Sequence, residues 1–214
     1  MKADRFALPV ALMLAATVAV AGCDSTPAVS AAAQSVPATN QRCEPATLLT
    51  CLLSAPSGSR ETVRIDTPAA MTAQQFVDAY YAQAPQSQRN DEVALLPKLG
   101  VRSIAGDGWL ANDDHINIVL LQFGTPAAAL DRSRHAALQD SVRSTKVTLD
   151  GIPGNVVVYQ ALKPDEQGVA HTVAFGDFGT VELDVFFASP LRPDQPRLTT
   201  WLDQQCTLLT GKAL

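Results

Sequence analysis

The sequence predicts an α+β domain in which an antiparallel β-sheet packs against helices, and three observations support this class. Hydrophobic and polar residues alternate along residues 180–187, which indicates an antiparallel strand with one solvated face. Residues 169–175 form a second such run, and the glycine-bounded turn 176–179 joins the two into a predicted hairpin. The element order is helices, two strands, a helix, three or four strands and a helix, so we expect the helices on one side of the sheet.

The first predicted helices precede the strands. Residues 45–53 begin with a proline in the first turn, as helices often do. Thr72 and Gln75 have the spacing of a capping box, and apolar residues recur on one helical face over residues 76–84. A further short helix is predicted at residues 91–96.

After Gly100 the hydrophobic period changes to that of strands. A strand over 101–109 bends at two closely spaced glycines, and the turn 112–114 leads into a strand over 116–123 that we expect to be buried on both faces. The remaining elements are predicted in this order: a helix over 125–139 with a threonine cap and a proline in its first turn, strands over 146–149 and 156–162, the hairpin, and a helix over 197–209.

The first 23 residues have the pattern of a bacterial secretory signal. Lys2 and Arg5 give a positive start, and the apolar run 6–20 is shorter than the about 20 residues that a membrane span needs. An ordinary signal peptide with a chance cysteine is one interpretation. The run ends, however, in a sequence that resembles the lipobox of bacterial lipoproteins: Val20, Ala21, Gly22 and Cys23.

That resemblance implies a lipid anchor and a location in the cell. Signal peptidase recognises Val20, Ala21 and Gly22, the Cys23 thiol becomes a diacylglyceryl cysteine, and the signal is removed before it. Two acyl chains, of the palmitate type, give the two-signal anchoring that one chain cannot provide. The resemblance therefore implies a lipid-anchored protein on the extracytoplasmic face of the cell membrane. Asp24 favours the inner membrane where a host has two, which leaves inner and outer membrane both open.

We therefore expect three segments. Residues 1–22 are the lipoprotein signal peptide. Residues 23–42 are the lipidated cysteine and a flexible stalk, because small, polar, proline-spaced residues bury too little surface to offset their ordering entropy. Residues 43–212 form a single extracytoplasmic domain.

The net charge argues against nucleic acid as a partner. The chain carries a formal charge of −5 and shows no cluster of lysine and arginine, whereas phosphate binding requires clustered cations.

Three cysteines remain if Cys23 is acylated, and the extracytoplasmic space is oxidising. Cys43, Cys51 and Cys206 allow three pairings. If Cys43 and Cys51 are both helical, their Cα atoms lie about 12 Å apart, too far for a disulfide. We therefore favour a disulfide to Cys206, from Cys43 first and from Cys51 second, and rank the Cys43–Cys51 pair third.

No catalytic residue, metal ligand or cofactor is predicted. The three histidines, His115, His135 and His171, have no metal-ligand spacing. Glu182 and Asp184 share one strand face at a spacing that a catalytic pair could use, but we favour a solvated sheet face as their explanation. Four aromatic residues are expected in the core, with an apolar pocket as the alternative: Tyr80, Tyr81, Trp109 and Trp201.

Residues 100–210 resemble the small extracytoplasmic domains of actinobacterial lipoproteins and the PknH-like sensor domain. The features that carry the resemblance are Trp109, the strand 116–123, the helix from Thr125, and Trp201 before Cys206. The resemblance implies a Mog1/PsbP-like sandwich of sheet and helices. Members of these groups mostly lack known catalytic residues.

The functional hypothesis is a non-catalytic binding, sensor or interaction module tethered to the membrane at the cell envelope. Its partner is an envelope protein or a small apolar ligand, and a deep apolar cavity between sheet and helices would favour the ligand. The alternative is a cell-envelope hydrolase. Clustering of His171, Glu182 and Asp184 around one concave pocket would favour that enzyme, whereas scatter over a convex surface would count against it.

Overall fold

A seven-stranded antiparallel sheet with helices on both faces forms the centre of the computed structural model, which describes residues 45–64, 72–82, 84–190 and 195–211. The strand order is β1-β2-β3-β7-β6-β5-β4. The strands are β1 (Arg60–Arg64), β2 (Val101–Ala111), β3 (Asp114–Phe123), β4 (Ser144–Val147), β5 (Val156–Ala161), β6 (Val169–Phe178) and β7 (Val181–Pro190). The helices are the 3₁₀ helix η2 (Pro45–Cys51), α1 (Ala73–Tyr80), α2 (Gln86–Lys98), α3 (Pro126–Ser141) and α4 (Gln195–Thr210).

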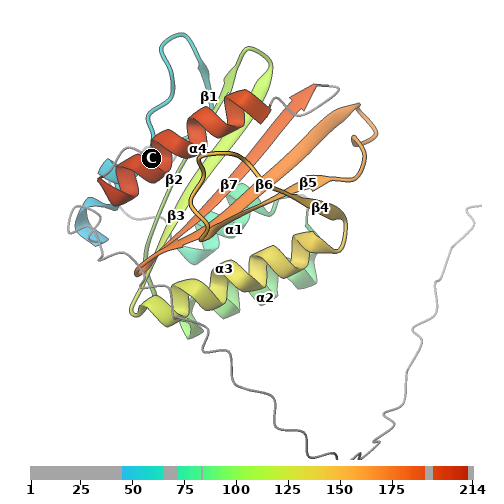
Figure 1. Cartoon of the computed structure of the whole chain (residues 1–214). Coiled ribbons are helices and arrows are strands. Elements are labelled where there is room, and N and C mark those ends of the chain that lie inside the picture. Colours follow the sequence, from blue (N-terminus) through green and yellow to red (C-terminus); the bar gives the residue numbers. More distant parts are fainter. Residues whose placement is uncertain (1–44, 65–71, 83, 191–194, 212–214) are drawn as a thin grey trace, which may run out of the picture. The chain divides into compact units, whose positions relative to one another are not determined.

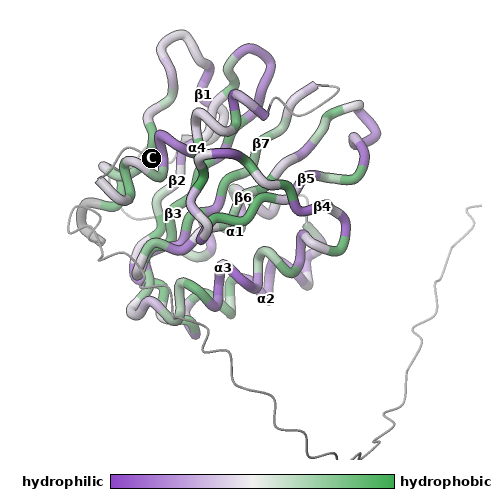
Figure 2. Tube along the Cα trace, in the orientation of Figure 1, coloured by the Kyte–Doolittle hydropathy of each residue, from purple (hydrophilic) through white to green (hydrophobic). Residues whose placement is uncertain are grey.

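The predicted α+β class is confirmed, but the expected one-sided arrangement of helices is wrong. Helices η2 and α4 pack on one face of the sheet, whereas α1, α2 and α3 pack on the other (Figure 1). The reason lies in the central strand β3, which is buried on both faces as its continuous apolar sequence predicts. Figure 2 shows hydrophobic residues along the central strands and alternating hydrophilic and hydrophobic residues along α2 and α3.

The face under α4 carries the larger apolar core. Trp109 on β2 and Phe187 on β7 both contact Trp201 of α4, with ring centroids 6.3 and 5.7 Å apart. Ile118 and Leu183 lie beside them and are almost fully buried. Trp109 and Trp201 are therefore core residues, as expected.

The opposite face has a smaller apolar core at the end where β2 begins. Val119 and Leu121 of β3 pack against Phe76 of α1, Leu96 of α2 and Ala129 of α3. All five are at most 2% exposed. This core fixes the three helices over one end of the sheet and leaves the other end of the same face less covered.

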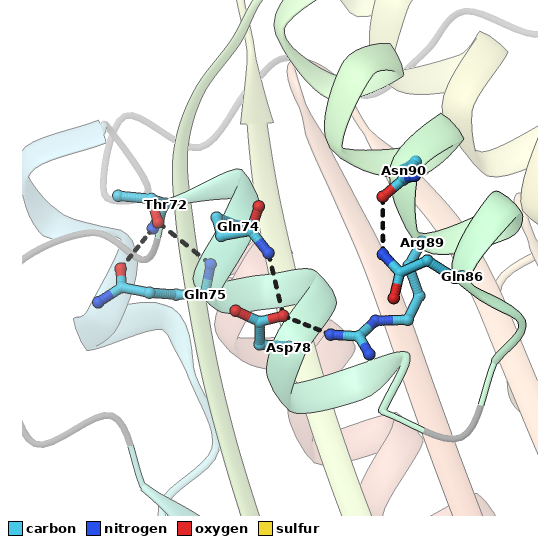
Figure 3. A network of polar contacts seen from close by, with 7 residues as sticks. All are labelled: Thr72, Gln74, Gln75, Asp78, Gln86, Arg89 and Asn90. Atoms are coloured by element: carbon cyan, nitrogen blue, oxygen red, sulfur yellow. Dashed lines mark hydrogen bonds and ion pairs between the residues drawn. The ribbon is translucent and has the colours of Figure 1, made fainter.

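Helices α1 and α2 are joined by polar contacts at their ends (Figure 3). The predicted capping box is confirmed: the Gln75 amide donates to Thr72 Oγ1 at 3.1 Å, and the Thr72 amide donates to Gln75 Oε1 at 2.8 Å. Arg89 of α2 donates to Asp78 of α1 at 2.6 Å. The capping box therefore closes the first turn of α1, and the Arg89–Asp78 contact holds α1 against α2.

Several element boundaries differ from those predicted. Strand β1 was not predicted, because its sequence lacks an apolar alternation; it pairs with β2 at the edge of the sheet. Helix α2 begins at Gln86 rather than Asp91, in a polar stretch without hydrophobic period. Strand β2 passes through its two glycines without a break. The hairpin turn falls at Gly179, which has a φ of 66°, so Gly176 lies inside β6.

The structure contradicts a disulfide at Cys206. Its thiol is free and 0% exposed, inside the core between α4 and the sheet. A buried free thiol packs as a small apolar group. Cys43 lies outside the described residues, so the structure does not test the third pairing, Cys43–Cys51. That pairing is the one that remains.

Some predictions fall on residues outside those the structure describes. They are the signal peptide 1–22 with Val20, Ala21 and Gly22, the lipidated Cys23, the stalk to residue 42, and Cys43.

Candidate ligand-binding site

The sheet face under α1, α2 and α3 forms the floor of the candidate site. Strand register places Asn117 of β3 beside Phe186 of β7, and Phe186 beside Val173 of β6. The next row along contains Asp184 of β7 and Phe175 of β6. Because alternate residues of a strand point to the same face, all of these side chains project toward the helices.

A cavity of about 830 Å³ lies above this floor. The end of α1, the first turn of α2 and the end of α3 form its walls, and the start of β4 completes the rim. Its volume falls in the range of about 300–1,000 Å³ that is usual for small-molecule sites. Aromatic and ionisable side chains in its lining include Tyr80, Tyr81, Asp140, Tyr159, His171, Phe175, Asp184 and Phe186.

Aromatic rings supply much of the cavity wall. Tyr80 and Tyr81 come from the end of α1 and are held in place by Phe76, with ring centroids 5.4 and 5.6 Å away. Phe186 lies on the floor, 5.3 Å from the ring of His171. The two tyrosines were expected in the core, with a pocket as the alternative. They are partly buried, pack against the apolar core around Phe76 and also line the cavity, so each expectation holds in part.

Two carboxyl groups line this cavity, Asp140 at the end of α3 and Asp184 on its floor, and Asp184 has the more strongly raised pKa. Within the described residues it has neither a hydrogen-bond partner nor an ion-pair partner within 4.0 Å, although it is only partly exposed. Burial raises its pKa to about 7; the Arg132 guanidinium lowers the pKa, and the carboxyl groups of Asp140 and Glu92 raise it. A carboxyl group that titrates near neutral pH inside a cavity marks a candidate functional site.

A buried ion network lies below Asp184, between the sheet and the helices. Arg132 of α3 is 1% exposed, and its Nη2 atom lies 2.5 Å from Glu92 Oε1 and 3.1 Å from the Tyr81 hydroxyl. Its Nη1 atom lies 3.7 Å from Glu182 Oε1. Buried guanidinium groups need such partners because an unpaired charge is costly away from water.

Glu182 corrects the expectation of a solvated sheet face. It is 0% exposed, and neither carboxylate oxygen has a hydrogen-bond partner among the described residues. Burial raises its pKa to about 8, while Arg132 lowers the pKa and the carboxyl groups of Asp184 and Glu92 raise it. The alternation along β7 correctly places Glu182 and Asp184 on one face, but α3 covers that face.

The histidines divide as follows. His171 lines the cavity, and its Nε2 atom lies 2.8 Å from Asp165 Oδ2. His115 lies 3.1 Å from the Thr62 hydroxyl, outside the cavity. His135 is exposed on α3 and bonds to Gln139. Within the described part of the chain, no three histidine, cysteine, aspartate or glutamate side chains are grouped as metal ligands would be.

Sequence reasoning identified Glu182, Asp184 and His171 as candidates but missed Arg132, Glu92 and Asp140. The sequence does contain a signal for Arg132. It is an arginine on the apolar stripe of a helix, because Arg132 lies between Ala129 and Ala136 and all three share one face of α3. A charged residue at such a position indicates a buried partner, although it does not say which one.

No helix in the described ranges combines the length and the hydrophobicity that crossing a membrane requires.

Known proteins resemble this chain weakly in structure and not in sequence. No family model matches the chain, and no curated protein matches it in sequence. Among solved structures, the extracellular domain of PknH from Mycobacterium tuberculosis is similar with a TM-score of 0.41 and 13% sequence identity, over 56% of this chain and 68% of that one. The resemblance to PknH-like sensor domains is confirmed only as this weak structural likeness.

Proposed function

We propose that this chain is a lipid-anchored, extracytoplasmic binding module that holds a small organic ligand in the cavity above β6 and β7 and catalyses no reaction. The observation that carries the proposal is the cavity of about 830 Å³, whose lining combines aromatic side chains with the unpaired carboxyl group of Asp184. Ligand sites in proteins typically combine a mostly apolar wall with a few polar groups that orient the ligand. The lipobox at Val20–Cys23 supports the anchored location.

The test is native mass spectrometry of the mature lipoprotein, extracted from membranes of its host in a mild detergent. We expect a co-purifying mass that is lost on denaturation. The matched comparison is Ala79→Trp, which introduces a bulky side chain at a partly exposed, cavity-lining position of α1. We expect this variant to lose the co-purifying mass, and near-ultraviolet circular dichroism checks that it folds. A ligand retained in full by the folded Ala79→Trp variant would place the ligand elsewhere, and a wild-type chain that captures no small molecule from host extract would contradict the proposal.

One observation supports the alternative of a cell-envelope hydrolase. His171 and Asp184 line the same cavity, which is part of the clustering that would favour an enzyme. Glu182 is absent from that lining. Ser144 lines the cavity as well, but among the described residues His171 bonds only to Asp165 and not to a serine or cysteine nucleophile. Hydrolysis of p-nitrophenyl acetate or phosphate that is lost in both His171→Gln and Asp184→Asn would favour this alternative.

A further inference from the structure

Carboxyl groups outnumber cations around the floor of the cavity. Glu92, Glu182, Asp184 and Asp140 all act electrostatically on one another or on the same guanidinium, that of Arg132. Burial is the largest cause of the raised pKa of Asp140, as it is for Glu182 and Asp184. With one interior guanidinium among four carboxyl groups, the cluster acquires a deficit of positive charge as Asp184 and Glu182 ionise, which happens as the pH rises through their raised pKa values of about 7 and about 8.

Arg132 is already committed to other partners. It contacts Glu92 at 2.5 Å, the Tyr81 hydroxyl at 3.1 Å and Glu182 at 3.7 Å. None of these contacts reaches Asp184, whose carboxylate is accessible from the cavity. Asp184 is therefore the acceptor that a ligand can reach.

The positive groups at the rim do not remove the deficit. Arg143 is exposed to solvent, where water screens its charge. His171 is paired with the carboxylate of Asp165, so the pair adds no net positive charge even when the imidazole is protonated.

The aromatic walls favour the same kind of ligand. Tyr80, Tyr159 and Phe186 line the cavity around Asp184 and present π systems to it. A cation within about 6 Å of an aromatic face is attracted by the ring quadrupole, and the attraction is stronger where water is excluded. The Tyr80 hydroxyl is also buried without a hydrogen-bond partner among the described residues, beside the same cavity.

We propose that the cavity selects organic cations: a protonated amine carried on an apolar or aromatic body, with the amine donating to Asp184 and the body lying against Tyr159 and Phe186. This inference rests on the proposed ligand-binding function and names its ligand class. A bound ammonium group supplies the donors that Asp184 lacks and offsets the excess of carboxylates, whereas an anionic ligand adds to that excess.

The test compares three probes of similar shape and different charge: 2-phenylethylammonium, 2-phenylethanol and 3-phenylpropionate. Each is titrated by isothermal calorimetry into the full mature lipoprotein in a neutral detergent at pH 8, with protein-free micelles as the blank. We expect the ammonium probe to bind at least tenfold more tightly than the alcohol, and the carboxylate to bind most weakly. At pH 8 Asp184 is largely ionised, so the comparison is made in the state that favours a cation.

Asp184→Asn is the site variant, and Asp177→Asn is its matched control. Asp177 lies one register row away on the same sheet face, is half-buried and does not line the cavity. We expect the preference for ammonium over alcohol to vanish in Asp184→Asn and to persist in Asp177→Asn. Near-ultraviolet circular dichroism checks that both variants fold, and the three-probe comparison on the unmodified chain decides the question even if one of them does not.

The outcomes separate this inference from the proposed function. Equal binding of all three probes, or a preference for 3-phenylpropionate, overturns selection of cations but leaves a ligand-binding cavity in place. Failure of the ammonium probe to bind, combined with a neutral or anionic mass in the native spectrum, also overturns the inference alone. Failure of all probes together with an empty native spectrum overturns both.

Discussion

Glu182 lies at the centre of the buried ion network, and its ionisation is costly. It is 0% exposed, both of its oxygens lack hydrogen-bond partners in the described structure, and its nearest cation is 3.7 Å away and shared with Glu92. At this distance from a shared charge, burial outweighs attraction, which is why its pKa is raised to about 8 rather than lowered. The folded domain therefore keeps a proton that the unfolded chain releases.

The first prediction is that the domain loses stability as pH rises. For Glu182 the unfolded pKa is near 4.5 and the folded pKa is about 8; for Asp184 the values are 3.8 and about 7. A raised carboxyl pKa stabilises the fold fully below the unfolded pKa, and that stability is lost as pH rises through the folded pKa. We expect the free energy of unfolding in urea to fall by about 2–4 kcal/mol between pH 5 and pH 8.

Glu182→Gln isolates the cause. The variant cannot ionise at this position, so we expect it to have a flatter pH dependence and to be at least as stable as the original chain at pH 8. Glu166→Gln, which changes an exposed glutamate in the loop before β6, is the control and leaves the pH dependence unchanged. A slope that is the same in all three proteins would show that Glu182 is not the group that holds the proton.

The second prediction concerns Arg132. Arg132→Met leaves Glu92 and Glu182 buried without their cation, so we expect the free energy of unfolding at pH 8 to fall by about 3–5 kcal/mol. At pH 5 the loss is smaller, because the protonated carboxyl groups need no counter-charge. Arg134→Met, two residues along α3 and exposed, changes stability by less than about 0.5 kcal/mol. Equal losses in the two variants would contradict a buried network.

At the scale of elements, α1 depends on its cap. It has only eight residues, and isolated helices of that length are marginal in water. The third prediction is that Thr72→Ala lowers the free energy of unfolding by about 1 kcal/mol, because it removes the side-chain acceptor of the Gln75 amide. Urea unfolding measures the change.

A double-mutant cycle with Gln75→Ala tests whether the two contacts act together. The Gln75 side chain accepts from the Thr72 amide, so each residue orients the other. We expect the double variant to lose less than the two single losses combined. Strict additivity would mean that the two bonds form independently.

Elements with strong local signals could be predicted from the sequence, and elements without them could not. The caps at Thr72 and Thr125 and the apolar run of β3 all gave correct elements. Strand β1 and the first turn of α2 consist of polar residues whose structure depends on tertiary partners. The prediction of which sheet face is solvated was wrong for the same reason. Alternation along β7 shows which residues share a face, but only tertiary packing shows that α3 covers that face.

The site was predictable only in part. Asp184, His171 and the two tyrosines were recognised as chemically capable residues, but their meeting in one cavity depends on strand register and on the end of α1. Arg132 lies about fifty residues from Glu182 in sequence, so no local pattern connects them. The ion network is a property of the assembled layers.

At the scale of the whole molecule, the reactivity of the cysteines shows which thiols are free and which are paired. The fourth prediction is that a maleimide does not react with the folded chain, because Cys206 is buried and its thiol pKa is raised by burial to about 12. In denaturant without reductant we expect one thiol to react, since Cys43 and Cys51 are predicted to be paired and Cys23 acylated. With reductant, three thiols react.

Mass spectrometry counts the attached maleimides. Cys206→Ala is the control and is expected to show none before reduction. Two or three labels without reductant would mean that the Cys43–Cys51 disulfide does not form.

The fifth prediction concerns the proposed lipid anchor. The Cys23 thiol is the only group in the lipobox-like sequence Val20–Cys23 that can form a thioether, so Cys23→Ser removes the proposed acceptor of the diacylglyceryl group. We expect the variant to lose incorporation of an alkynyl palmitate analogue in the host and to leave the lipid-anchored membrane pool. Cys206→Ala keeps both properties, because its thiol lies in the core of the folded domain. Equal labelling of the two variants would mean that the lipid is attached elsewhere, and the cavity would then need another explanation for its place at the envelope.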